Sequence, residues 1–377
     1  MNDEVQKQTS LVSAYSLDRE ALIAIVTEVG GETWRADQVF TWLYHGRASC
    51  WADMTNLPAV LRAALSERLR DLDGTAHVEE TAVEGGGTNK LLLRLYDGER
   101  IETVIIPARN RNTVCVSSQV GCAFNCAFCA SGLHGVVRSL EAGEIVAQVV
   151  RVAEKLGTRP DNVVFMGIGE PFANYDAVLQ AARILNDPDA LGIGARKITF
   201  STCGVVPGIE RLAEEGVQFE LSVSLHAPTQ ALRETIMPVA AKWPLGVLME
   251  TCRAYTERTN RIITFEYTLI DGFNNLPVHA QQLVKLLRGL KCRVNLIPLN
   301  PVPEFDGRAP VVADSEAFYA IWSEQGLIPR FGVQRGVVLM PVVVSCAIGG
   351  CVRRATDRLG EELTRRARRA RKGIHHD

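Results

Sequence analysis

The sequence predicts an α/β protein, an open (β/α)6 partial barrel that follows a small helical module and a β-hairpin extension. Three observations support this fold. Residues 1–75 show helical periodicity, residues 76–108 alternate with a period of two, and the chain from Thr113 onward repeats the order strand, loop and helix. We therefore expect a helical accessory module (1–75), the hairpin extension (76–108), the barrel (109–336), and a cysteine-bearing loop with a basic C-terminal helix (337–377).

The N-terminal module is predicted to contain three helices. Ser16 precedes Leu-Asp-Arg-Glu and is a suitable cap for the first helix, with Glu20 near the reciprocal position of a capping box. The second helix is expected over residues 35–45 and the third over residues 58–72, because apolar side chains recur on one face of each. The aromatic residues of this module are expected to lie mainly in its core.

The strands of the hairpin and the barrel follow from their patterns. Residues 90–96 and 100–106 alternate between apolar and polar positions and are predicted to pair as the hairpin. Repeated strand–helix units imply parallel strands with right-handed crossovers, and six units are too few to close an eight-stranded barrel. The six predicted barrel strands span residues 114–118, 162–166, 197–201, 218–225, 262–270 and 292–298. Helices are expected between them, for example over residues 140–156, 175–185 and 280–290, and a short helix–strand pair near 315–335.

Three cysteines stand close together at the start of the barrel. Cys122, Cys126 and Cys129 form a C-x3-C-x2-C pattern. A [4Fe–4S] cluster is ordinarily held by four cysteines, so three thiolates leave one iron open. An open coordination position is what a metal centre needs in order to bind a reactant. The triplet therefore predicts a catalytic iron–sulfur centre.

Three other interpretations of these cysteines are weaker. They could be small buried apolar residues, or part of a zinc site whose fourth ligand would be Cys115 or His134. A disulfide framework is not expected in a chain of 377 residues without a secretion signal. The iron–sulfur centre is the favoured interpretation.

Composition and charge describe an ordinary soluble protein. No apolar run approaches a membrane span and the N-terminus lacks a leader pattern, so we expect a cytoplasmic protein without membrane contact. The formal net charge is −2, but residues 353–377 hold nine Lys or Arg against four Asp or Glu, so this tail carries about +5. The run at 365–372 could bind RNA phosphates. The alternative is a solvated face of a terminal helix.

Polar residues follow four of the predicted strands. In parallel sheets the chemistry gathers at the carboxyl ends of the strands. Met-Gly-Ile-Gly-Glu-Pro at 166–171 combines glycines, which let the backbone approach a ligand, with a carboxylate that can take an ammonium group. The other polar strand ends lie at residues 201–204, 222–227 and 295–301. Each is a weak signal alone, but together they predict a ligand site beside the cysteine loop.

These segments resemble a known family. The triplet with Phe128 before its third cysteine resembles the signature of the radical S-adenosylmethionine (SAM) enzymes. Residues 116–122, 166–171, 224–227 and 295–301 are similar to the RlmN/Cfr family of radical-SAM RNA methyltransferases, as are 35–38 with Trp42 and 100–104. The resemblance covers roughly residues 17–336 and implies a partial barrel of the radical-SAM type.

The resemblance implies an activity, its cofactors and its partners. A methyl group would be added to an unreactive adenine carbon, carbon 2 rather than carbon 8, in 23S ribosomal RNA and in some members also transfer RNA. The cofactors would be a [4Fe–4S] cluster and SAM, with an electron donor such as flavodoxin, and the enzyme would be a monomer. The helical module would bind RNA.

The resemblance also implies roles for single residues. Cys122, Cys126 and Cys129 would hold the cluster, Cys115 would be the resolving cysteine, and Glu102 would accept a proton. A cysteine near the C-terminus would carry the methyl group and form a covalent adduct with the RNA. The positions that match SAM contacts are Gly169, Glu170, Ser201, Ser224, Leu225, His226 and Asn300. The alternative for His226 and Asn300 is a structural hydrogen bond.

One segment departs from the family pattern. After Arg335-Gly336 the family continues with Asp-Ile and then Ala-Cys-Gly-Gln-Leu, whereas this chain has a longer apolar run that leads to Cys346 and then Cys351. Small residues surround Cys346, so we predict that it carries the methyl group. Two other functions stay open. One is a radical-SAM reaction on another substrate, and the other is a non-catalytic RNA-binding protein with a structural cluster.

Overall fold

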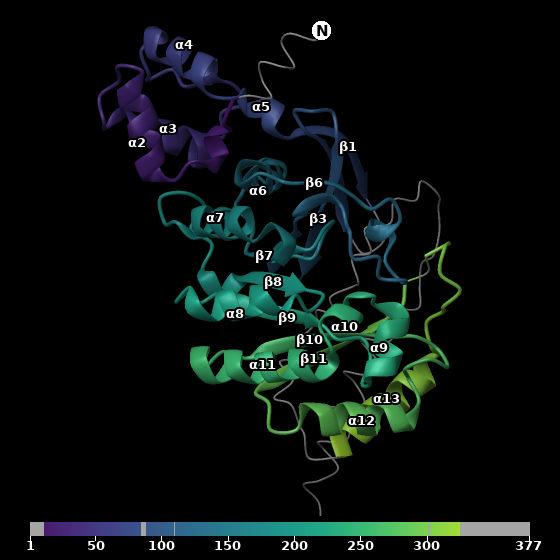
Figure 1. Cartoon of the computed structure of the whole chain (residues 1–377). Coiled ribbons are helices and arrows are strands. Elements are labelled where there is room, and N and C mark those ends of the chain that lie inside the picture. The colour runs from purple at the N-terminus through teal and green to yellow at the C-terminus, as the bar shows by residue number, and fades with distance from the viewer. Residues whose placement is uncertain (1–10, 84–87, 109, 301, 325–377) are drawn as a thin grey trace, which may run out of the picture. The chain divides into compact units, whose positions relative to one another are not determined.

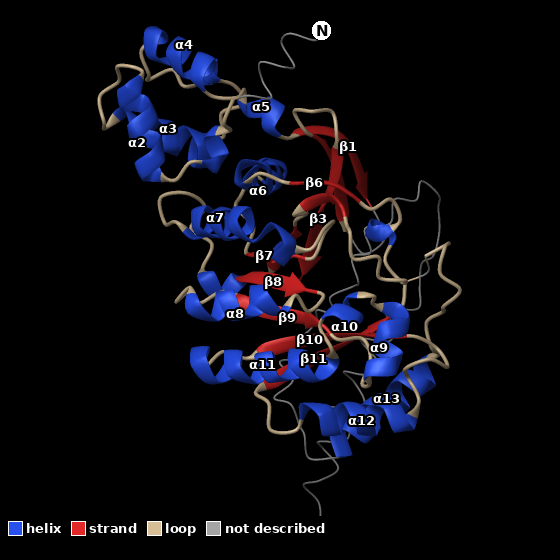
Figure 2. Cartoon of the chain, viewed as in Figure 1, coloured by secondary structure: helices blue, strands red, loops and turns tan. Residues whose placement is uncertain are grey.

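The computed structural model describes residues 11–83, 88–108, 110–300 and 302–324. The chain forms two compact units. Unit 1 comprises residues 1–122 and 136–200, and unit 2 comprises residues 123–135 and 201–377. A run of helices comes first and a run of strands follows, and from about residue 136 onward helices and strands mostly alternate (Figure 2). None of the helices in the described ranges is long and apolar enough to cross a membrane.

Unit 1 begins with short helices. They are η1 (Ala14–Ser16), α2 (Arg19–Glu28), α3 (Arg35–Thr41), the π-helix η2 (Trp42–Gly46), η3 (Trp51–Asp53), α4 (Ala59–Arg68) and α5 (Leu72–Thr75). The predicted cap at Ser16 is wrong. Asp18 caps α2 by accepting from the Ala21 N–H at 2.8 Å. The Ser16 hydroxyl instead accepts the N–H of Gly143, 127 residues away in sequence, at 2.8 Å.

The sheet of unit 1 combines antiparallel and parallel strands. The strands β1 (His77–Val83), β2 (Asn89–Arg94), β3 (Arg100–Ala108) and β4 (Arg111–Cys115) pair in sequence order as an antiparallel meander. The predicted hairpin is therefore present as β2 and β3, and β1 extends it. β7 (Asn162–Phe165) then pairs with β4 in parallel, and β8 (Ile198–Thr202) pairs with β7 in parallel.

Two long amphipathic helices belong to unit 1. α6 (Ala142–Leu156) and α7 (Tyr175–Asn186) lie side by side (Figure 1). α6 is buried over most of its length because η1 also packs against it. Gly143 permits this contact, since a Cβ at that position would lie 2.5 Å from the Ser16 hydroxyl oxygen.

Unit 2 has a three-stranded parallel sheet with helices. β10 (Ile263–Leu269) pairs with β9 (Glu220–Ser224) on one side and with β11 (Cys292–Pro298) on the other. The helices are α8 (Val206–Glu214), α9 (Gln230–Ile236), α10 (Val239–Lys242), α11 (Leu245–Thr259), α12 (Pro277–Leu287) and α13 (Val312–Glu324). α8 packs beside α11, and α12 beside α13 (Figure 1). The described strands close no barrel, so the predicted open α/β architecture is confirmed.

Candidate active site

The cysteine triplet lies on a loop whose ends are joined by a small sheet. β5 (Gln119–Gly121) pairs with β6 (Val136–Ser139) in antiparallel fashion, and the loop runs between them. Within the loop the Cys129 N–H donates to the Cys126 carbonyl at 3.0 Å. Asn125 has a φ of 47°, a left-handed conformation that asparagine tolerates better than most residues. The stretch from Cys126 to Cys129 is therefore a turn, and the short helix η5 (Ala130–Gly132) follows it.

The glycine-rich turn after β7 is locked onto the segment that follows β4. A Cβ at Gly167 would lie 2.7 Å from the Val116 carbonyl oxygen, and one at Gly169 would lie 2.6 Å from Cβ of Gln119. Gly169 also has a φ of 102°, which side chains rarely adopt. The Glu170 N–H donates to Oε1 of Gln119 at 2.9 Å. Both glycines are thus required by close approach of the backbone to its neighbours.

Glu170 is buried at the end of this turn. Its Oε1 accepts the N–H of Phe172 at 3.0 Å, so the carboxylate caps the short helix η6 (Pro171–Asn174). This contact fixes the orientation of the side chain that the sequence assigns to a SAM ammonium group. The hydrogen bond to Phe172 has a structural role, and the predicted contact of Glu170 with SAM would be a second role of the same side chain.

Cys115 and Glu102 share one face of adjacent strands. Cys115 lies directly opposite Val104 across the β3–β4 pair, and Glu102 is two residues from Val104 on the same face. The Cys115 thiol is fully buried, and this burial raises its pKa to about 12. Cys115 is therefore a neutral thiol at physiological pH.

A buried glutamine that the sequence did not single out supports this region. Gln148 on α6 accepts from the Thr103 hydroxyl and from the Ser117 N–H, each at 2.8 Å, and donates to the Ser117 carbonyl at 3.0 Å. The Ser117 hydroxyl in turn donates to the Glu102 carbonyl at 2.7 Å. Glutamine on a helix is usually exposed to solvent, so the sequence does not indicate that Gln148 is buried and holds these groups.

In unit 2 the end of β9 is fixed by the main chain of β10. The N–H groups of Leu225 and His226 donate to the Glu266 carbonyl at 3.0 and 3.2 Å. His226 has a φ of 56°, and its Nδ1 accepts the Thr268 N–H at 2.9 Å. Phe128 of the cysteine loop contacts the imidazole edge-on, with ring centroids 4.7 Å apart.

The environment of His226 keeps the imidazole neutral. Burial, together with the nearby Arg233 guanidinium, lowers its pKa to about 3. Because Nδ1 accepts a hydrogen bond, the proton of the neutral ring is on Nε2. One ring nitrogen thus makes a structural hydrogen bond, while Nε2 offers a donor for the predicted contact with SAM.

A second buried acid lies on the same sheet. The Ser222 hydroxyl lies 2.8 Å from Oε1 of Glu266, and the Asn295 amide donates to Oε2 at 2.8 Å. Burial raises the pKa of Glu266. Glu266 lies in the middle of β10, so the polar residues at the strand ends, which predict the ligand site, do not include it.

The remaining predicted residues are less constrained. Ser201 lies in β8, Ser224 is the last residue of β9, and Asn300 follows β11 with its side chain partly buried. The predicted methyl carrier Cys346 and its alternative Cys351 lie outside the described residues, as does the basic run at 365–372.

Comparison with known proteins decides the family. Residues 13–70 match the family model "Ribosomal RNA large subunit methyltransferase N-terminal domain", and residues 116–280 match "Radical SAM superfamily". A protein of Geobacillus kaustophilus named "Probable dual-specificity RNA methyltransferase RlmN" is 48% identical over 302 residues, covering 79% of this chain and 82% of the relative. A Synechocystis protein of the same name is 44% identical over 322 residues, covering 85% and 91%. The chain belongs to the RlmN family.

A solved structure agrees with this assignment. A radical SAM methyltransferase from Sphaerobacter thermophilus superposes with a TM-score of 0.81 at 44% identity, covering 84% of this chain and 93% of the other. As a member of the RlmN family, the chain is a SAM-dependent RNA methyltransferase of the radical SAM superfamily. Its cofactors are a [4Fe–4S] cluster and SAM.

The donor set of the cysteine loop fits such a cluster. Cys122, Cys126 and Cys129 form no disulfide among the described residues, and all three are partly exposed, unlike the buried Cys115. Thiolate is the usual protein ligand of iron–sulfur clusters. Within the described ranges no three His, Cys, Asp or Glu side chains are gathered at a metal-binding distance. The assignment of these three ligands therefore stays a prediction.

Proposed function

We propose that this RlmN-family enzyme methylates an adenine carbon, carbon 2 in preference to carbon 8, in 23S ribosomal RNA and in transfer RNA. The curated relatives carry the name dual-specificity RNA methyltransferase, and the N-terminal match is to a ribosomal RNA methyltransferase domain. The structural observation that carries the proposal is the placement of Cys115 and Glu102 on one face of β4 and β3, with Glu102 two residues from the cross-strand partner of Cys115. A thiol and a carboxylate so placed suit a reaction that must move a proton and exchange a sulfur bond.

The cofactors would be held by residues from several strand ends. Cys122, Cys126 and Cys129 would ligate the cluster. The SAM contacts would come from Gly169, Glu170, Ser201, Ser224, Leu225, His226 and Asn300. When bound, the cluster and SAM supply a carbon radical that can remove a hydrogen from an unactivated methyl group. This chemistry is needed because adenine carbon 2 is not nucleophilic.

The chain's own residues would carry the group that is transferred. Cys346 would bear the methyl group and become joined through it to the adenine carbon. Glu102 would then accept the proton lost from that carbon, and one electron would leave the adduct with that proton, which balances the electron spent in cleaving SAM. The Cys115 thiolate would attack the Cys346 sulfur, so that a disulfide forms, the bond between sulfur and the transferred carbon breaks, and that carbon takes up a proton. Other cellular thiols would reduce the disulfide for the next turnover.

The state of Cys115 explains the order of these events. With a pKa of about 12 the thiol is almost wholly protonated at neutral pH, so it is a poor nucleophile until a base is brought to it. A change in the surroundings of Cys115 that accompanies adduct formation would therefore switch the resolving step on.

Mass spectrometry of digested RNA tests the proposal. Ribosomal and transfer RNA are purified from cells that contain or lack this protein. We expect 2-methyladenosine only where the protein is present. A product methylated at carbon 8 would correct the position, and identical nucleosides in both samples would refute the proposal.

A further inference from the structure

Arg233 on α9 is a fully buried guanidinium that the proposed mechanism does not use. Its Nε donates to the Leu225 carbonyl at 3.2 Å. Its Nη2 donates to the carbonyls of Cys203 at 2.6 Å and Ser224 at 3.2 Å. Arg233 thereby holds the last residues of β9, which are predicted to contact SAM, and the loop that follows β8.

The other terminal nitrogen of Arg233 is unused. Nη1 is buried and has no hydrogen-bond partner among the described residues. No carboxylate of the described ranges is among the titratable groups that act on this guanidinium; those groups are the thiols of Cys203, Cys126 and Cys252, which act on it when they are ionised. A buried cation without an anion is destabilising, and three backbone carbonyls offset only part of its cost of desolvation. The arrangement is complete only when an anion reaches Nη1.

The cysteine loop lies against the helix that carries Arg233. The Ala127 N–H donates to the carbonyl of Ile236, the last residue of α9, at 2.9 Å. Ile236 is three residues, about one helical turn, from Arg233. Of the three thiols near the guanidinium, Cys203 and Cys252 are buried and only Cys126 is partly exposed. Cys126 is also the only one of the three that the proposed function makes a ligand of the cluster.

We propose that Arg233 is a positioning residue of the cluster site, and that its Nη1–H donates to the sulfur of Cys126. This inference rests on the proposed function, because it takes Cys126 to be a cluster ligand. The buried positive charge then offsets the negative charge of the thiolate-ligated cluster. The same side chain holds the Ser224 and Leu225 carbonyls, so the cluster loop and the SAM-binding strand end are fixed by one group.

The proposed contact has a consequence for the reduction potential. Reduction adds an electron, so a nearby buried cation stabilises the reduced cluster more than the oxidised one. Hydrogen bonds to the ligand sulfurs act in the same direction. Removal of the charge should therefore make the cluster harder to reduce, which is a property that a purely structural arginine would not alter.

Redox titration of the full-length protein tests the inference. Wild type, Arg233→Met and Arg233→Lys are reconstituted anaerobically, and the midpoint potential is followed by electron paramagnetic resonance. We expect a clear negative shift for Arg233→Met and a smaller one for Arg233→Lys, which keeps the charge but has too few donors. Arg258→Met is the matched control, because Arg258 is 59% exposed and pairs with Glu214, so its charge is screened by solvent.

Each other outcome overturns the inference in its own way. A wild-type potential in Arg233→Met at full iron content would make Arg233 structural only. An unchanged potential with weakened SAM binding, seen as a smaller spectral change on SAM addition, would assign Nη1 to the SAM carboxylate instead. A wild-type protein that takes up no cluster would refute the proposed function itself, and this inference with it.

One measurement needs no variant and covers the case in which the substitutions prevent folding. Wild-type protein labelled with ¹⁵N-arginine is reduced and examined by pulsed electron paramagnetic resonance. We expect hyperfine coupling between an arginine nitrogen and the cluster, since Nη1 would be hydrogen-bonded to a ligand sulfur. An absence of coupling would refute the contact.

Discussion

Burial keeps two of the predicted site residues neutral. It raises the pKa of the Cys115 thiol to about 12 and lowers the pKa of the His226 imidazole to about 3. A neutral thiol does not attack before a base reaches it, and a neutral imidazole with its proton on Nε2 can donate without adding charge. The sequence identifies both residues. It does not predict their protonation states, because these depend on how the side chains are packed in the fold.

The shift at His226 predicts a pH-dependent stability. The folded pKa lies below the ordinary value of 6.5, so only the unfolded chain gains this proton as the pH falls from 6.5 toward 3. The contribution of His226 to the free energy of unfolding is therefore fully present above pH 6.5. Below pH 6.5 it falls by about 1.4 kcal/mol for each pH unit. His226→Asn, which tolerates the left-handed backbone, should remove this part of the slope.

Urea unfolding of the apoprotein between pH 7 and pH 4.5 measures the effect. The unfolding free energy of wild type should fall more steeply toward acid than that of His226→Asn. Glu266, whose pKa burial raises, contributes with the opposite sign in both proteins and cancels in the comparison. Parallel pH profiles for the two proteins would mean that His226 is protonated in the folded state.

Replacement of Cys115 should trap the reaction. Cys115→Ala removes the proposed resolving thiol, so a covalent protein–RNA adduct should accumulate, visible as a species of reduced gel mobility. Cys252→Ala is the control, because Cys252 is also fully buried and its loss leaves a cavity of similar size. Adduct with the control variant, or none with Cys115→Ala despite SAM cleavage, would remove Cys115 from the mechanism.

At the scale of elements, strand positions followed closely from the sequence. The expected strand at 292–298 is β11 without change, and the expected 262–270 is β10 shortened by one residue at each end. The expected 114–118 begins earlier, as β4 (Arg111–Cys115), because its partner β3 continues to Ala108 and pairs with those residues. Pairing between segments that are distant in sequence decides where a strand ends, and the local sequence does not indicate it.

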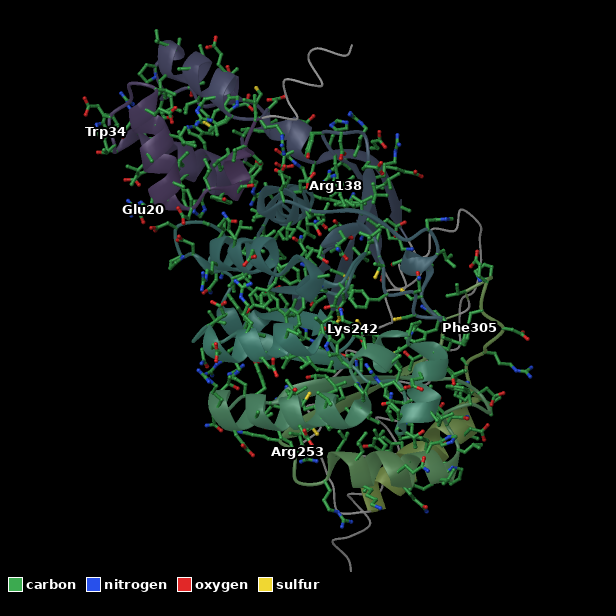
Figure 3. All side chains as sticks on the ribbon, viewed as in Figure 1. Glu20, Trp34, Arg138, Lys242, Arg253 and Phe305 are labelled. Atoms are coloured by element: carbon green, nitrogen blue, oxygen red, sulfur yellow. The ribbon has the colours of Figure 1, made fainter. Side chains whose placement is uncertain are left out.

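The two strands that enclose the cysteine loop were missed. β5 has three residues and β6 has four, too few for alternation to be recognised. In the structure, Arg138 of β6 forms ion pairs with two carboxylates. Its guanidinium binds Asp97 at 2.5 Å and the buried Glu144 at 2.8 Å (Figure 3). Glu144 is six residues away in sequence, whereas the contact with the partly exposed Asp97 joins segments 41 residues apart.

The glycine-rich turn gives a prediction at this scale. Gly169→Ala should displace the turn, because its Cβ would lie 2.6 Å from Gln119 Cβ in addition to the strain of a positive φ. Backbone strain alone costs about 1–2 kcal/mol, and a displaced turn would move Glu170. We expect SAM affinity to fall by at least about tenfold, equivalent to 1.4 kcal/mol.

Gly157→Ala is the matched control for this turn. Gly157 has a φ of 70° but open space around it, so the variant carries the strain without the clash. Equilibrium binding of SAM to both reconstituted variants, with thermal unfolding in parallel, separates stability from binding. Equal SAM affinity in Gly169→Ala and wild type would contradict the predicted role of the turn.

For the molecule as a whole, positive charge is unevenly distributed. The family-model match at residues 13–70 contains six Arg against seven Asp or Glu, so this segment cannot attract RNA by net charge. Its exposed features include Trp34, which is 51% exposed, with the Arg35 guanidinium 3.9 Å above its ring (Figure 3). Electrostatic attraction to RNA is instead predicted for residues 353–377, which carry about +5.

Deletion of residues 364–377 should therefore weaken RNA binding in a salt-dependent way. The segment contains six Lys or Arg and one Asp. Each phosphate contact that is lost lowers the slope of log K against log salt by about 0.7–0.9, so the full set would lower it by about 4–5. Binding of labelled ribosomal RNA fragments across a KCl series measures this slope.

A variant with the six basic residues changed to Gln keeps the length of the chain and should behave like the deletion, while SAM cleavage without RNA stays at the wild-type rate. If affinity and slope match wild type in both variants, the basic run is a solvated end of the chain and RNA recognition lies elsewhere.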